Sequence, residues 1–169
     1  RAWADLIDAN RDQIARLESV VSSRPQDEAR TIDVATASEY LRFYAEWCDK
    51  LEGNVTASGP DAVSLVLREP YGVVAIITPW NFPLILSTWK IAPAIAAGNT
   101  VVVKPSELTP FSMVRLAELA VEAGIPPGVV NVIHGEGGAV GPALTCHPGV
   151  AYVSFTGSTA VGGRIMADL

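Results

Sequence analysis

Four short apolar segments that alternate with helical stretches constrain the fold of this chain more than any other feature. The segments lie at 73–77, 100–103, 129–133 and 151–155. Continuous apolar runs of this length are typical of strands buried on both faces of a sheet. Helical spacing follows at 84–97, at 110–123 with Thr109 as the expected N-cap, at 135–146 and from Gly162 onward. The alternation predicts an α/β fold with a parallel, right-handed, doubly wound sheet.

The first 69 residues differ in composition from the rest. They carry 21 charged side chains, against 9 in the remaining 100 residues. Apolar residues at helical spacing predict two long amphipathic helices, at 2–22 and 27–51, separated by Arg24-Pro25. A turn at 58–61 and a weakly alternating strand at 62–68 follow them. The poorly charged remainder of the chain is expected to be largely buried.

Composition also argues against several classes of partner. The 169 residues carry a net charge of −6 with no basic stripe, which disfavours nucleic acids and anionic lipid surfaces. Two cysteines do not make a disulfide framework, so a reducing cytoplasm is the expected location. Residues 70–89 lack charge over the length of a membrane span. We reject a span because Pro79 and Pro83 would break its helix and Asn81 would lack a partner in lipid.

The segments that follow the predicted strands are the places where a ligand would bind, since open parallel sheets bind ligands beyond their carboxyl ends. These segments are 78–83, 104–107, 135–141 and 155–163. The glycines of 135–141 are spaced Gly-x-Gly-Gly-x-x-Gly, which departs from the usual dinucleotide fingerprint. The loop 157–162 lacks the Lys and Ser/Thr that a Walker A phosphate loop needs. Each glycine loop by itself also fits a plain tight turn.

Three polar residues at these strand ends each leave two interpretations open. Lys104 and Glu107 can donate to and accept from vicinal hydroxyls, because one carries an ammonium and the other a carboxylate. They also fit a surface ion pair at the end of a strand. The amide of Asn81 can donate to a developing oxyanion, or it can satisfy its own turn.

The thiols and histidines offer weaker candidates. Cys48 lies on the apolar face of the second predicted helix, where a buried structural cysteine is expected. Cys146-His147 is adjacent in sequence without an orienting carboxylate, so we expect a loop without chemistry there. His134, Cys146 and His147 lack a fourth partner at a metal-ligand spacing, and no metal site is predicted.

The four segments that follow the strands together carry a family resemblance, as the residues in and around them illustrate. Residues 69–83 read Glu-Pro-Tyr-Gly-Val-Val-Ala-Ile-Ile-Thr-Pro-Trp-Asn-Phe-Pro. They are followed by Ala97-Gly98-Asn99-Thr100 leading to Lys104-Pro105-Ser106-Glu107, and then by Phe155-Thr156-Gly157-Ser158-Thr159. In order and spacing these segments resemble the NAD(P)-dependent aldehyde dehydrogenase superfamily, and the helical residues 1–52 resemble its N-terminal helices. The resemblance covers essentially the whole chain.

The resemblance implies an incomplete Rossmann-like sheet preceded by N-terminal helices. Residues 1–169 would be the N-terminal part of the NAD(P)-binding domain, without the thiol-bearing catalytic domain. Within it, the leading helices would extend to residue 58, the start of a β arm would occupy 62–69, and βαβ units would begin at residue 70. The arm would pair with a segment of another subunit that lies outside this chain.

The resemblance also implies roles for individual residues. Lys104 and Glu107 match the residues that bind the adenine ribose hydroxyls, and Glu107 then favours NAD, although some members with this residue also accept NADP. Ser158 matches the residue that contacts the pyrophosphate, and Asn81 matches the oxyanion-hole amide. The other implied cofactor contacts are Ile77, Thr78, Pro79, Trp80, Gly137, Gly141, Phe155, Thr156, Gly157 and Val161.

In the family reaction, a cysteine thiolate attacks an aldehyde, hydride passes to the nicotinamide, and a glutamate-activated water releases the acid. The matching Cys and Glu would lie beyond Gly162, and the sequence stops at Leu169 before either. We therefore expect the N-terminal portion of an aldehyde-oxidising enzyme. A non-catalytic nucleotide-binding fragment is the alternative from a different class. An acyl-transferring or semialdehyde-specific member would share the same cofactor half.

Membership of this family would make the parent protein a cytoplasmic homodimer or homotetramer that takes an aldehyde as its substrate. An incomplete sheet exposes an unpaired edge and a bare apolar face. The isolated chain is therefore expected to aggregate.

Overall fold

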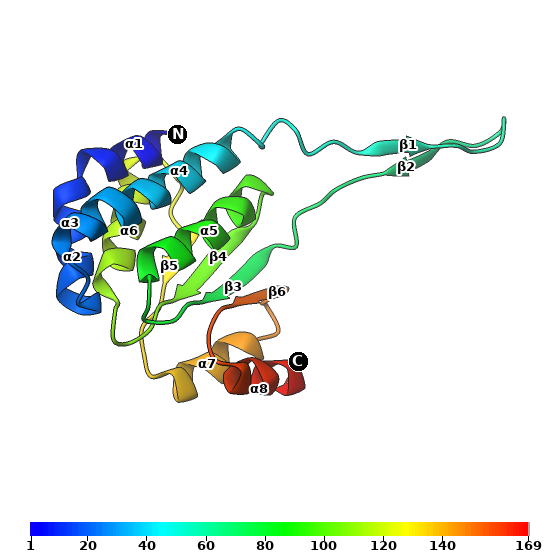
Figure 1. Cartoon of the computed structure of the whole chain (residues 1–169). Coiled ribbons are helices and arrows are strands. Elements are labelled where there is room, and N and C mark those ends of the chain that lie inside the picture. The colour runs from blue at the N-terminus through cyan, green and yellow to red at the C-terminus, as the bar shows by residue number, and fades with distance from the viewer. Residues whose placement is uncertain (169) are drawn as a thin grey trace.

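A four-stranded parallel sheet forms the centre of the fold in the computed structural model, which describes residues 1–168. Its strands lie side by side in the order β5-β4-β3-β6 (Figure 1). Their bounds are β3 Val73–Ile77, β4 Thr100–Lys104, β5 Val130–Val132 and β6 Tyr152–Phe155. The expected strands and their parallel pairing are confirmed. Because β4 and β6 flank β3 on opposite sides, the strand order reverses beside β3, where such sheets bind ligands.

The helices that connect the strands cover opposite faces of the sheet. Their bounds are α5 Pro83–Ala96, α6 Phe111–Glu122, α7 Gly137–Thr145 and α8 Thr159–Asp168. Figure 1 shows α5 with the N-terminal helices on one face and α7 with α8 on the other. A doubly wound sheet is thereby confirmed. No helix within residues 1–168 combines the length and the apolar character that a membrane crossing needs.

The N-terminal region is more broken than the sequence predicts. Its elements are α1 Ala2–Ala9, α2 Arg11–Ser22, α3 Gln26–Glu28, the π-helix η1 Ala29–Asp33 and α4 Val34–Ala45. The single helix expected at 2–22 is wrong, because the chain breaks at Asn10, whose side-chain Nδ2 donates to the carbonyl of Leu6 at 2.8 Å. The second predicted helix ends at Ala45 instead of residue 51, and hydrogen-bonded turns follow.

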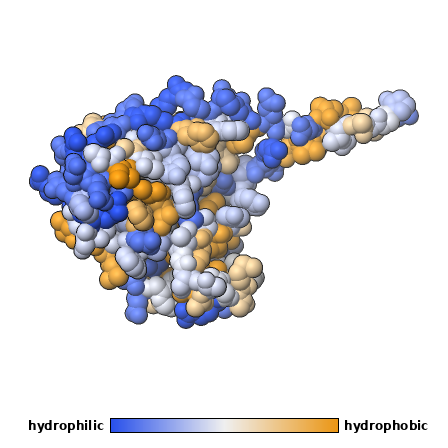
Figure 2. All heavy atoms as spheres, viewed as in Figure 1, coloured by the Kyte–Doolittle hydropathy of each residue, from blue (hydrophilic) through white to orange (hydrophobic). Residues whose placement is uncertain are grey.

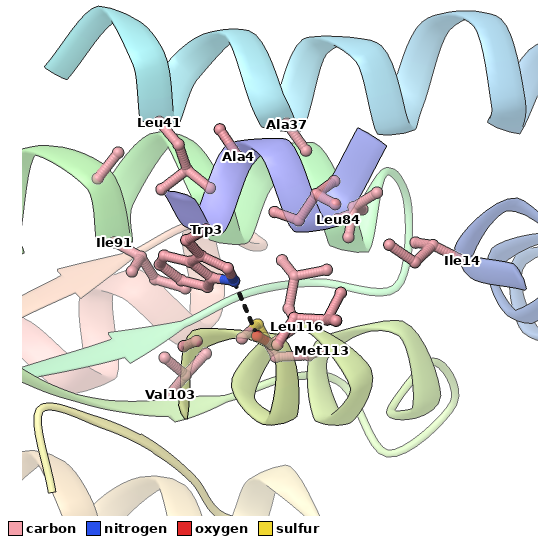
Figure 3. Packing of buried hydrophobic residues seen from close by; sticks show 14 of the residues in the cluster. Trp3, Ala4, Ile14, Ala37, Leu41, Leu84, Ile91, Val103, Met113 and Leu116 are labelled. Atoms are coloured by element: carbon pink, nitrogen blue, oxygen red, sulfur yellow. Dashed lines mark hydrogen bonds between the residues drawn. The ribbon is translucent and has the colours of Figure 1, made fainter. Parts of the chain in front are cut away.

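The hydrophobic core lies between β3 and β4 and the helical layer above them. α1, α2, α4, α5 and α6 all contribute buried side chains, among them Ile7, Ile14 and Leu116. The indole of Trp3 reaches into this core and donates from Nε1 to the carbonyl of Leu116 at 3.0 Å (Figure 3). One hydrogen bond thus satisfies the polar end of a buried aromatic residue and ties α1 to α6.

A two-stranded hairpin projects from the body (Figure 1). β1, Asn54–Thr56, pairs antiparallel with β2, Ser64–Val66. Two expectations need correction here: residues 54–56 form a strand instead of belonging to the leading helices, and β2 has a partner within this chain. Val55 and Leu65 are exposed, so the hairpin has little core of its own. Its stability rests on the backbone hydrogen bonds between β1 and β2, and a hairpin of two strands alone is only marginally stable in water.

Helix ends agree with the sequence at the glycines and differ at one threonine. Gly98 and Gly124 adopt φ values of +86° and +88° where α5 and α6 end, a conformation that favours glycine. The side chain of Asn99 then donates to the carbonyl of Ala94 and accepts from the amide of Gly72, each at 3.0 Å. The prediction that Thr109 caps α6 is wrong. α6 begins at Phe111 with Pro110 in the N-cap position, and the hydroxyl of Thr109 makes no hydrogen bond to the helix.

Candidate functional site

The carboxyl ends of β3 and β4 meet at the point where the strand order reverses. Ile77 and Lys104 are partners in the parallel register. The amide of Thr78 donates to the carbonyl of Lys104 at 3.2 Å and extends the pairing by one residue. The buried hydroxyl of Thr78 lies 3.2 Å from the hydroxyl of Ser87 on α5. The position of the strand ends is therefore fixed by hydrogen bonds on both sides.

Lys104 is buried at this strand end, with a relative exposure of 2%. Its Nζ donates to the carbonyl of Pro105 at 3.0 Å and to Oε2 of Glu107 at 3.2 Å. Oε1 of Glu107 is the acceptor in a long contact of 3.5 Å from the amide of Gly137. The backbone N–H of Glu107 itself, with Lys104 and Gly137, lowers the pKa of this carboxyl against a smaller effect of burial. A surface ion pair does not describe an ammonium held in this way.

A cavity of about 250 Å³ opens beside Lys104, between α7 and α8. Five of the predicted cofactor residues line it together: Ile77, Lys104, Gly137, Gly141 and Val161. A Cβ added at Gly137 or Gly141 would meet no atom within 4 Å, so the space over α7 is open at both glycines. The volume of the cavity is sufficient for a small planar group. Its lining is mostly apolar, and the buried cation in it is Lys104.

The predicted residues 155–158 lie around a second hollow, of about 610 Å³. The ring of Phe155 packs over Gly157, where an added Cβ would lie 2.4 Å from the ring atom Cζ. The amide of Thr156 donates to the carbonyl of Ile77 at 3.0 Å and places this segment next to β3. Oγ of Ser158 accepts from the amide of Val161 at 3.3 Å in the first turn of α8. The two hollows lie on either side of α8 and share Ile165.

The loop after β3 stands apart from both hollows. Trp80 and Asn81 are exposed, and Pro79 lines neither hollow. Within residues 1–168 the Asn81 side chain makes no hydrogen bond to satisfy its own turn. Phe82, the next residue, has a left-handed φ of +52°. The structure thus places most of the predicted cofactor residues around two hollows, and it leaves Thr78, Pro79 and Trp80 at a third place with the predicted oxyanion amide.

Comparison with known proteins identifies the family. The model of the aldehyde dehydrogenase family matches residues 1–169. This chain belongs to the aldehyde dehydrogenase family. It is 44% identical over 165 residues to the NADP/NAD-dependent aldehyde dehydrogenase PuuC of Escherichia coli, covering 98% of this chain and 33% of that protein. It is 48% identical over 165 residues to the phenylacetaldehyde dehydrogenase of Pseudomonas fluorescens, covering 94% and 33%.

Solved aldehyde dehydrogenases share the fold over nearly the whole chain. The enzyme KauB from Pseudomonas aeruginosa superposes with a TM-score of 0.97 at 47% identity, over 99% of this chain and 34% of that one. An indole-3-acetaldehyde dehydrogenase in complex with NAD+ superposes with a TM-score of 0.95 at 43% identity, over 98% and 34%. The chain spans about a third of the length of the curated relatives it matches. The N-terminal part of an aldehyde dehydrogenase fold is therefore confirmed.

Sequence reasoning missed half of the wall of the aldehyde dehydrogenase cavity. α7 contributes Gly138, Pro142 and Thr145 to it, and α8 contributes Arg164, Ile165 and Asp168. These residues repeat at helical spacing together with Gly141 and Val161, each set on one face of its helix. The spacing was available in the sequence. Only tertiary packing establishes which faces of α7 and α8 turn toward each other.

The remaining candidates are the two cysteines and the histidine that follows one of them. Cys48 is exposed in the turns after α4, so the expectation of a buried core cysteine is wrong. Cys146 is also exposed, and Nδ1 of the neighbouring His147 accepts from the amide of Gly149 at 3.0 Å. Among residues 1–168 no three His, Cys, Asp or Glu side chains are grouped so as to hold a metal ion.

Proposed function

We propose that this chain supplies the cofactor cradle and the oxyanion amide of an NAD(P)-dependent enzyme that oxidises an aldehyde to its acid. The buried Lys104, held against Glu107 at the end of the cavity between α7 and α8, carries the proposal. A donor and an ionised acceptor side by side suit the two vicinal hydroxyls of a ribose. The neighbouring apolar cavity suits the adenine ring attached to that ribose.

The same pair favours NAD over NADP. Because hydrogen bonds lower the pKa of Glu107, its carboxyl is ionised at neutral pH. A carboxylate at the ribose would repel a 2′-phosphate, whereas it accepts from a 2′-hydroxyl. Because the relative PuuC is an NADP/NAD-dependent aldehyde dehydrogenase, we propose a preference and not an exclusion.

The segment 155–158 would contact the pyrophosphate. Oγ of Ser158 already accepts from the amide of Val161, which leaves its hydroxyl hydrogen free to donate to an anion. The first turn of α8 adds unpaired backbone N–H groups and a favourable dipole. Ile77, Thr78, Pro79 and Trp80 would form the wall along the cofactor. A bound dinucleotide would supply the hydride acceptor for the reaction.

Asn81 is the catalytic residue that we assign to this chain. Its exposed amide can donate to the oxygen of an aldehyde as negative charge develops there. We assign the thiolate nucleophile and the glutamate base to no residue of 1–169. The alternative is a non-catalytic nucleotide-binding fragment, which would use the same cofactor residues.

For the domain organisation, we propose that residues 1–169 form the N-terminal part of the cofactor domain and that the hairpin of β1 and β2 is an oligomerisation arm. The hairpin exposes Val55, Val63, Leu65 and Leu67 while projecting from the body. Exposed apolar side chains on a projecting strand pair are a surface for another subunit. A homodimer or homotetramer in the cytoplasm would cover them.

The test uses the full-length protein that contains residues 1–169, with NAD+ and a panel of aldehydes, following formation of NADH. Asn81→Ala is expected to lower kcat by about 10²–10³-fold and to leave the Kd for NAD+ nearly unchanged, because an oxyanion donor acts on the transition state. Asn54→Ala, an exposed asparagine on the hairpin and outside both hollows, is the control. NAD+ binding without turnover in the unsubstituted protein would support the non-catalytic alternative. An unchanged kcat in Asn81→Ala would overturn the oxyanion assignment.

A further inference from the structure

Three charged residues of the N-terminal region are buried against the start of α5. Glu18 on α2 and Asp33 at the end of η1 are both fully buried, with 0% relative exposure. Arg24, in the link between α2 and α3, has a side chain that is 20% exposed. Acidic side chains are almost never fully buried unless something pairs with them. Glu18, Arg24 and Asp33 are here called the charge cluster. The residues that they contact indicate which part of the fold the cluster stabilises.

The contacts of the charge cluster converge on two residues just after Asn81. The guanidinium carbon of Arg24 lies 4.6 Å from the ring centroid of Phe82. Nε of the same guanidinium lies 2.7 Å from Oδ2 of Asp33, in an ion pair that departs from linear hydrogen-bond geometry. Oε1 of Glu18 accepts from the amide of Leu84 at 3.3 Å. The contact from Arg24 thus restrains Phe82, and the hydrogen bond to Glu18 restrains the first turn of α5.

Phe82 needs such restraint because its backbone conformation is unfavourable. Its φ of +52° and ψ of 48° lie in the left-handed region, which a bulky aromatic residue rarely adopts. Pro83 follows, and a residue before proline is also restricted toward extended conformations. Strained backbone of this kind persists only where the surroundings over-determine it. The left-handed turn at Phe82 comes directly after Asn81 and joins it to the first turn of α5.

We infer that Glu18, Arg24 and Asp33 are positioning residues that hold the Phe82 turn and thereby aim the amide of Asn81. Arg24 clamps the ring of Phe82, Asp33 orients the guanidinium, and Glu18 caps α5 at Leu84. The consequence for catalysis rests on the proposed function, whereas the consequence for the loop does not. The N-terminal helices are then part of the active-site support as well as of the core.

The first test measures hydrogen exchange over residues 80–86 in the full-length protein by mass spectrometry. Glu18→Leu removes the acceptor for Leu84 and is expected to speed exchange there by roughly tenfold. Glu18→Gln keeps an oxygen at the same place and is expected to restore protection to within about threefold of the unsubstituted protein. Equal protection of residues 80–86 in the Leu and Gln variants would overturn the assignment of Glu18.

The Arg24 arm of the test uses a pair of substitutions so that Asp33 is not left buried without its partner. The double variant Arg24→Met with Asp33→Asn removes both charges and the clamp on Phe82, and it is expected to speed exchange in residues 80–86. Arg115→Met is the matched control, because that arginine is similarly buried, at 18% exposed, and pairs with Glu118 and Glu122 on α6. Equal loosening of residues 80–86 in both variants would reveal a merely structural role.

The second test links the charge cluster to Asn81 by a double-mutant cycle in kcat. If the cluster acts through Asn81, adding the Arg24→Met and Asp33→Asn pair to Asn81→Ala lowers kcat no further, because the amide it aims is gone. Fully additive losses in kcat would overturn the positioning role. If Asn81→Ala itself leaves kcat unchanged, the proposed function fails, and the exchange data still decide whether the cluster holds the loop.

Discussion

The two faces of the sheet are built in different ways. On the face covered by α5, α6 and the N-terminal helices, the core is dense and includes Trp3, Ile91 and Leu116. On the face covered by α7 and α8, α7 buries Leu144, and none of the side chains of α8 is fully buried. In Figure 2 the surface of the N-terminal helices is mainly blue, and orange side chains lie along the projecting hairpin.

The two faces have different roles: one stabilises the sheet, and the other leaves space for a ligand. The packed face holds the sheet and, through the charge cluster, the Phe82 turn. The open face presents the cavity beside Lys104 and the hollow around Phe155, where loose packing leaves space for a ligand. Because sites for ligands need concave space that a packed core excludes, we expect substitutions on the two faces to affect different quantities. Four predictions test this comparison.

The largest expected effect is on the packed face. Leu116 is fully buried at the centre of the core, and Leu116→Ala is expected to lower the free energy of unfolding by about 3–4 kcal/mol, through lost transfer energy and a cavity. Met166→Ala, on the exposed surface of α8 at 77%, is the matched control and is expected to change it by less than about 0.5 kcal/mol. Urea denaturation followed by circular dichroism measures both. Similar losses would mean that the two faces are equally packed.

The second prediction concerns pH and the buried carboxyl of Glu18. Burial raises the pKa of Glu18 to about 7, against the opposing hydrogen bond from Leu84. The folded state then binds a proton that the unfolded state releases above its own pKa of 4.5. This contribution to stability is complete below pH 4.5 and is lost as pH rises through about 7, a change of about 3 kcal/mol.

Burial raises the pKa of Asp33 as well, so the carboxyl of Asp33 adds a change of the same sign. Glu18→Gln removes one titrating group and keeps the acceptor for Leu84. The unsubstituted protein is therefore expected to lose more unfolding free energy than this variant as the pH rises from 5 to 8. A constant difference over that range would show that Glu18 is ionised throughout.

The third prediction moves to the open face, where binding should change more than stability. Lys104→Met removes the buried donor next to the cavity and is expected to weaken NAD+ binding by about tenfold, or about 1.4 kcal/mol. Lys90→Met, on α5 and outside the cavity, is the control and should bind NAD+ normally. Calorimetric titration with NAD+ gives both Kd values. Equal Kd values in the two variants would remove Lys104 from the proposed cofactor site.

The smallest expected effects distinguish two glycines of the open face. An alanine Cβ at Gly157 would lie 2.4 Å from the ring of Phe155, so the ring must move, and Gly157→Ala is expected to cost about 1 kcal/mol. At Gly163, inside α8, an added Cβ meets nothing within 4 Å. Gly163→Ala is therefore expected to stabilise the fold by about 0.5 kcal/mol. Thermal melting measures both shifts, and equal signs would contradict the close packing of Phe155.

The sequence predicted well those features that depend on neighbouring residues. Strands such as Val73–Ile77 follow from short apolar runs, and the ends of α5 and α6 follow from Gly98 and Gly124. The predictions failed where a side chain or a distant segment intervened. The amide of Asn10 interrupts a helix whose apolar spacing continues, and residues 54–56 form a strand because β2 returns to pair with them.

The candidate site shows the same division in its individual residues. The sequence, with its resemblance to aldehyde dehydrogenases, selected Lys104, Glu107 and Gly137, which the fold brings into contact with one another. It did not predict that Val161 and Ser158, which are hydrogen-bonded to each other at the start of α8, would line different hollows. Opposite faces of one helix differ by a few residues in sequence, and packing alone decides which face meets which neighbour.

The βα alternation, the family and the residues at the strand ends can be predicted from the sequence, because each depends on local spacing and turn chemistry. The cavity that α7 and α8 enclose beside Lys104 depends on tertiary packing. Tertiary packing also decides that Glu18 reaches Leu84, 66 residues further along the chain, and that Arg24 covers Phe82. Contacts over such separations form only when the elements pack, since no local preference specifies which buried carboxylate meets which helix end.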